Sequence, residues 1–159
     1  TAADLPDDKS NQSRASVLRM AKGLEMRLQA SPQDKEGWLL LAHSYHILQQ
    51  SEKALQTHER AAQLWPQDTE VLTLYARALV RTQSQGSSLA NKAFNLYRRV
   101  LELDPANTEA LYFVALGEAQ RKNPAEAAFL WKRLLALLEP QSETYREVQK
   151  QLDRLLSIK

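Results

Sequence analysis

A short proline-containing signal occurs four times along this 159-residue chain at nearly constant intervals. Its copies are Pro32-Gln33-Asp34, Pro66-Gln67-Asp68, Pro105-Ala106-Asn107 and Pro140-Gln141-Ser142, and successive prolines lie 34, 39 and 35 residues apart. In each copy the proline stops a helix, and the Asp, Asn or Ser two residues later can cap the next helix. A period of this length is typical of arrays in which one supersecondary unit repeats. The sequence therefore predicts a stack of helical units.

The unit between Lys35 and Asp68 shows the repeating pattern most clearly. Its first half carries Trp38, Leu41, Ala42 and Tyr45 at helical spacing, and its second half carries Ala54, His58 and Ala61. Large side chains at such positions fill the seam between two antiparallel helices, and the alanines allow the helices to approach closely. We expect helices over about 36–48 and 52–64, with a turn near residues 49–51 and Ser51 as the second N-cap.

The rest of the chain is organised around this unit. The polar, aperiodic segment at residues 1–13 is predicted to be a disordered linker, and residues 14–159 to be the folded domain. Within the domain we expect a half repeat over 14–34, repeats over about 35–68, 69–107 and 108–141, and a capping helix over 142–157. The second repeat has five extra residues, which fall in the Gly/Ser/Gln-rich stretch 82–88, a predicted loop. The predicted fold is an all-α superhelix of three hairpins with an extra helix at each end.

Composition and motifs favour binding over catalysis. The chain has no cysteine, which excludes disulfides, thiol catalysis and thiolate metal sites. A formal net charge of +2 does not indicate nucleic acid or an anionic membrane as the main partner. The sequence contains no stretch of about 18 apolar residues, no Gly-rich phosphate loop, no nucleophile elbow and no H-E-x-x-H motif. We therefore expect no catalytic residues, no cofactor and no insertion of this segment into a membrane.

The residues of the first full repeat resemble the tetratricopeptide repeat (TPR) family. The pattern W-x2-L-A-x2-Y, then A-x3-H and a proline, departs from that family only by Ala42 for Gly and His58 for an aromatic residue. The resemblance implies a right-handed superhelix. A narrower resemblance rests on residues 37–41, the long loop of the second repeat, and residues 127–140 with the Ser142 cap and the last helix. These segments resemble the periplasmic TPR domain of cytochrome c maturation proteins, including the accessory subunit of the haem lyase that serves formate-dependent nitrite reductase.

The narrower resemblance implies a role and a location. In that family the domain follows a membrane anchor and a linker, and it holds the C-terminal segment of an apocytochrome c while haem is attached. We therefore expect a bacterial periplasmic protein, tethered by an anchor missing from this chain, whose partners are an apocytochrome and other haem lyase subunits. A generic TPR scaffold that assembles another complex is the alternative. A second alternative is an enzyme subunit whose active site a partner completes.

The repeat pattern assigns a peptide-binding groove to the first helix of each hairpin. The predicted lining is Leu39, His43 and His46 in the first repeat, Thr73, Arg77, Val80 and Arg81 in the second, and Tyr112, Leu116 and Ala119 in the third. This mixed lining suits an amphipathic helix or a peptide end, and Arg77 with Arg81 can meet a carboxylate. The alternative is that some of these side chains simply pack against the last helix. The Lys and Asn clamp of chaperone-docking repeats is missing, because Leu39 and His43 occupy its positions.

Two other constellations have a simpler interpretation. His43 and His46 lie on one helix face, but the sequence offers no third metal ligand at a readable spacing, so no metal site is predicted. Trp38 and Trp131 fall at seam positions, which favours a core role over a stacking platform for nucleic acid.

Overall fold

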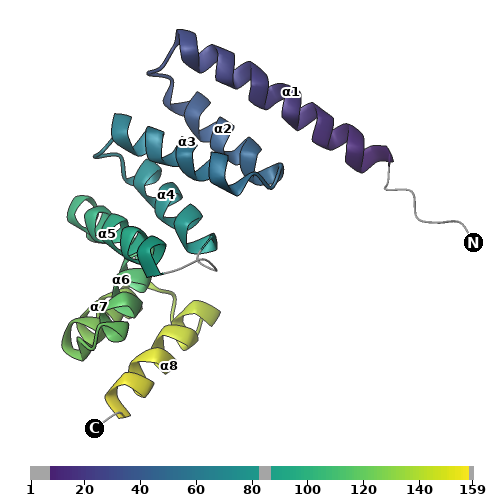
Figure 1. The fold of residues 1–159 in the computed structure, drawn as a ribbon. Coiled ribbons are helices and arrows are strands. Elements are labelled where there is room, and N and C mark those ends of the chain that lie inside the picture. Colours follow the sequence, from purple (N-terminus) through teal and green to yellow (C-terminus); the bar gives the residue numbers. More distant parts are fainter. Residues whose placement is uncertain (1–7, 83–86, 158–159) are drawn as a thin grey trace, which may run out of the picture. The chain divides into compact units, whose positions relative to one another are not determined.

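The computed structural model of this protein describes residues 8–82 and 87–157, and within these ranges it contains eight α-helices and no strand (Figure 1). The helices are α1 (Asp8–Ala30), α2 (Lys35–Ile47), α3 (Ser51–Leu64), α4 (Thr69–Arg81), α5 (Ser87–Leu103), α6 (Thr108–Gln120), α7 (Pro124–Leu137) and α8 (Glu143–Ser157). The predicted all-α fold of helical hairpins is confirmed. Among the described helices, none combines the length and the apolar character that crossing a membrane requires.

In all four proline signals, the side chain two residues after the proline caps the next helix, as predicted. The Asp34 carboxylate accepts a hydrogen bond from the Gly37 backbone N–H (3.0 Å), and the Asp68 carboxylate accepts one from Val71 (3.1 Å). In the second half of the chain, the Asn107 side-chain oxygen accepts a hydrogen bond from the Ala110 backbone N–H (2.9 Å), and the Ser142 hydroxyl accepts one from the Tyr145 backbone N–H (3.1 Å). Each bond satisfies one backbone donor that a helix N-terminus leaves unpaired. These caps fix where α2, α4, α6 and α8 begin.

Three boundaries differ from the sequence-based expectation. The predicted linker covered residues 1–13, but α1 already begins at Asp8. Polar residues are compatible with a helix whose surface faces solvent, so a polar composition does not exclude a helix there. Residues 1–7 lie outside the described residues. Ser51 is the first residue of α3, and its N-cap is Gln50, whose side chain makes no capping bond. The predicted loop 82–88 is wrong at its end, since Ser87 and Ser88 belong to α5; residues 83–86 are not described.

The chain divides into two compact units, residues 1–78 and 79–159. The core of the first unit joins α1, α2 and α3 and consists of Ala21, Leu24, Leu28, Leu41, Tyr45, Leu48 and Ala54. Ala54 is fully buried, as expected of a small residue at a close helix crossing. Trp38 packs against this cluster, and its indole N–H donates to the Pro32 carbonyl (2.9 Å), which confirms a structural role.

The core of the second unit joins α5, α6, α7 and α8. Its buried large side chains include Tyr97, Leu111, Trp131, Leu134, Val148 and Leu152, each no more than 4% exposed. Val148 and Leu152 belong to α8, which therefore covers the apolar side of the preceding hairpin. This is the arrangement that a terminal repeat needs to avoid exposing apolar surface.

Tyr45 gives the first unit a pH dependence that denaturation can measure. Burial and the hydrogen bond from its hydroxyl to the Glu25 carboxylate raise the pKa of Tyr45 to about 12. Between pH 10 and 12 the folded state keeps this proton while the unfolded state releases it, so stability that is present below pH 10 is lost as the pH rises towards 12. Urea denaturation from pH 9 to 12 should show a steeper loss in the native protein than in Tyr45→Phe. Parallel curves would contradict the prediction.

Candidate functional site

The predicted groove residues of the first unit lie on α2 and α4. Leu39, His46, Thr73 and Arg77 are half-buried and His43 is exposed. His46 has a contact that the sequence did not reveal: its Nε2 lies 3.2 Å from Nε2 of His58, a buried residue of α3. This pair joins the two helices of the first hairpin. Among the described residues, no three His, Cys, Asp or Glu side chains are grouped so that they could hold a metal ion.

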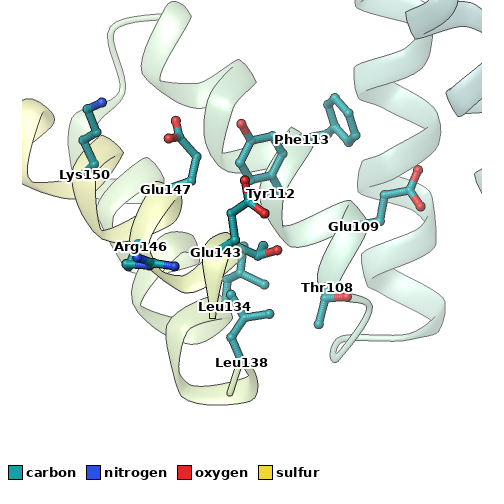
Figure 2. A pocket seen from close by; sticks show the side chains of 11 residues that line it. Thr108, Glu109, Tyr112, Phe113, Leu134, Leu138, Glu143, Arg146, Glu147 and Lys150 are labelled. Carbon is teal, nitrogen blue, oxygen red and sulfur yellow. The ribbon is translucent and has the colours of Figure 1, made fainter. Parts of the chain in front are cut away.

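The second unit contains a cavity of about 920 Å³ between α6, α7 and α8, which Figure 2 shows from close by. Tyr112, one of the predicted groove residues, lines it together with Phe113 of α6. Leu134 of α7 and Leu138, the C-cap residue that follows it, complete the apolar part of the cavity. The first turns of α6 and α8 border the cavity because the caps at Asn107 and Ser142 start both helices there. Such a cavity can accept an apolar side chain and leave polar groups at its edge.

Charged residues of α6 and α8 surround this apolar part. Glu109 comes from α6, and Glu143, Arg146, Glu147 and Lys150 come from α8. The Glu109 carboxylate accepts a hydrogen bond from the Tyr97 hydroxyl (2.8 Å), and the Glu147 carboxylate accepts one from the Gln151 amide (2.8 Å). Figure 2 shows the Glu143 carboxylate on the side of Tyr112 and the Lys150 side chain pointing away from it. With three carboxylates against two cations, the lining of the cavity has a negative formal charge.

A second, smaller cavity of about 300 Å³ brings together two more predicted groove residues, Val80 of α4 and Leu116 of α6. Phe113 lines this cavity as well as the larger one. At its edge the Arg121 guanidinium lies 3.6 Å from the centroid of the Phe94 ring. Gly117 makes this packing possible, since a Cβ there would lie only 2.4 Å from the Phe94 ring. Arg81 and Ala119 line neither cavity.

The sequence interpretation missed the contribution of α8 to the larger cavity. Glu143, Glu147 and Lys150 were assigned only to the capping helix, and Phe113 and Leu138 to no role. A signal was present, because α8 follows the fourth cap and so occupies the place of the first helix of a further repeat. Treating its first two turns as groove-lining would have found Glu143 and Glu147.

Comparison with known proteins identifies what the chain is similar to. Residues 5–145 match the family described as the cytochrome c-type biogenesis protein H TPR domain. The cytochrome c-type biogenesis protein CycH of Pseudomonas aeruginosa is 28% identical over 143 residues, and CcmH of Escherichia coli K12 is 29% identical over 147 residues. These matches cover 90% and 92% of this chain, but only 35% and 41% of those relatives. The chain therefore spans well under half the length of these two proteins.

A shorter relative and two solved structures extend the comparison. The formate-dependent nitrite reductase complex subunit NrfG of E. coli O157:H7 is 27% identical over 119 residues, which are 75% of this chain and 59% of that protein. A crystal structure of MamA matches with a TM-score of 0.64 at 15% identity, covering 98% of this chain and 95% of the other. YrrB, a TPR protein, matches with a TM-score of 0.62 at 21% identity, covering 82% and 64%. At these identities the structural matches show the fold alone.

Proposed function

We propose, from the premise that this chain belongs to the family of cytochrome c-type biogenesis protein H TPR domains, that it binds a segment of another protein without catalysis. The bound segment is the C-terminal part of an apocytochrome c, such as a nitrite reductase. Binding recruits that segment to a haem-attachment complex, whose other subunits are further partners. The relatives named for cytochrome c-type biogenesis and for a nitrite reductase complex support this proposal. The location that we propose with it is the bacterial periplasm.

The observation that carries the binding proposal is the cavity between α6, α7 and α8. Its volume of about 920 Å³ lies in the range of ligand-binding clefts, and its lining combines aromatic and aliphatic groups with charged ones. An amphipathic helix can insert its apolar face into a surface of this kind. YrrB, which shares the fold, is described as having an unusual peptide-binding site, and this supports a peptide as ligand. In the first unit, Leu39, His43, His46, Thr73 and Arg77 remain candidate contacts.

Titration with synthetic peptides tests this function. We expect 16-residue C-terminal segments of c-type cytochromes to bind with micromolar affinity by isothermal titration calorimetry, and scrambled versions to bind much more weakly. Tyr112→Ala should weaken binding by about tenfold or more, because it removes an aromatic wall of the cavity. Phe129→Ala is the matched control, since this aromatic residue of α7 is 54% exposed and lines neither cavity.

The generic scaffold is the second candidate function, and the exposed apolar side chains of α7 favour it. Phe129 and Leu137 are 54% and 50% exposed and lie on the same side of the helix, about two turns apart. A partner that docks there would lose affinity with Phe129→Ala and keep it with Tyr112→Ala. That result, or equal binding of native and scrambled peptides, would reject the proposed function.

A further inference from the structure

The charges at the mouth of the larger cavity are not arranged for helix stability alone. Glu143 and Glu147 are one turn apart on α8, and like charges at this spacing mildly destabilise a helix. Glu143, in the first turn, gains from the helix dipole, whereas Glu147, in the second turn, gains little. In the described part of the chain, neither glutamate forms an ion pair with Arg146 or Lys150 of the same helix. Apart from the Gln151 amide, which donates to Glu147, these carboxylates have no partner among the described charged residues of α8, so the pair presents negative charge at the mouth of the cavity.

The apolar part of the cavity lies directly beside these carboxylates. Tyr112 and Phe113 stand edge to face, with ring centroids 5.4 Å apart, and Leu134 and Leu138 lie next to them in the lining. A side chain that fills this space expels water from the cavity and lowers the effective dielectric constant at its edge. A cation held there would gain from the carboxylates and from the face of the Tyr112 ring. An anion would meet repulsion from both glutamates.

From this juxtaposition we infer the chemistry of the segment that the cavity accepts. It is a helical segment whose leucine or phenylalanine enters the cavity and whose lysine or arginine, one helical turn away, pairs with Glu143 and Glu147. The inference rests on the proposed function and specifies its ligand. Arg146 lies between the two glutamates in sequence and Lys150 follows Glu147, and Lys150 points away from Tyr112 (Figure 2). With Glu109, the cavity lining still carries three carboxylates against these two cations, so its formal charge stays negative.

Two 16-residue amphipathic peptides provide the test. Both carry Leu or Phe at positions i, i+4 and i+7 on an alanine–glutamine background, and they differ only in having two Lys or two Glu residues one turn from the apolar positions. Fluorescence anisotropy measures their binding to the native protein, to the double variant Glu143→Gln/Glu147→Gln, and to Glu126→Gln. Glu126 is an exposed carboxylate in the first turn of α7 and does not line the cavity. Circular dichroism checks that each variant is folded.

We expect the Lys peptide to bind the native protein about tenfold more tightly than the Glu peptide in 50 mM salt, and the ratio to fall to about two in 500 mM salt. The double variant should lose most of this preference, and Glu126→Gln should keep it. Equal binding of both peptides, or a preference for the Glu peptide, overturns the inference while leaving the proposed function intact. If neither the Lys peptide nor the Glu peptide binds, the proposed function is rejected together with the inference.

Discussion

Removal of residues 142–159 is expected to make the chain aggregate and to lower its melting temperature, because α8 covers apolar side chains of the hairpin before it. Val148 is completely buried and Leu152 is 4% exposed, so their deletion exposes the apolar side chains of the hairpin that they cover. Full burial of one such side chain contributes about 1.5–3 kcal/mol. The loss of two is comparable with a large part of the stability of a small domain, which is about 5–15 kcal/mol.

Light scattering after size exclusion and a thermal melt measure this effect. A shorter deletion, of residues 157–159 only, is the control, because it leaves Val148 and Leu152 in place and should change little. If the chain that ends at residue 141 remains monomeric with an unchanged melting curve, α8 does not act as a cap.

Replacement of Trp131 by alanine is expected to cost about 3–5 kcal/mol of unfolding free energy. Trp131 is 2% exposed in the core of the second unit, so the substitution leaves a large cavity that its neighbours fill only in part. Its indole Nε1 is buried and has no hydrogen-bond partner within the described structure. A buried donor without a partner carries a desolvation cost of about 1–3 kcal/mol. Trp131→Phe removes that donor, so it should cost much less than the alanine variant.

Urea denaturation of the two Trp131 variants and of Phe129→Ala checks this prediction. Phe129 lies on the same helix but is largely exposed, so its replacement should change stability by no more than about 0.5 kcal/mol. Equal losses for the alanine and phenylalanine variants of Trp131 would contradict the prediction, because they would show that the cavity left by the alanine variant carries no cost of its own. Equal losses for Trp131→Ala and Phe129→Ala would show that the core is not located as described.

The fold was predictable because its signals are local. The caps at Asp34, Asp68, Asn107 and Ser142 each depend on residues within one turn, so proline and cap spacing alone located four helix starts. The buried alanine and aromatic positions followed from helical periodicity. The early start of α1 was missed because an exposed polar helix and a disordered segment have similar compositions.

The candidate site was only partly predictable, because it depends on how helices are rotated against each other. Tyr112 was found from its position in the repeat, but the sequence does not show that Phe113 lines cavities on two sides of α6. The contact between His46 and His58 joins side chains 12 residues apart on different helices. Glu143 and Glu147 were missed because the last helix was interpreted only as a cover for the core.

The position of Phe113 has a consequence for any attempt to redesign this domain. Its ring stacks on Tyr97, with centroids 4.8 Å apart and an angle of 9°, and it meets Tyr112 edge to face. Because the Phe113 ring lines both cavities, a smaller side chain at this position changes the two cavities together. A substitution of Phe113 therefore cannot change the ligand preference of one cavity alone. A change meant for only one cavity has to be made at residues that line that cavity and not the other.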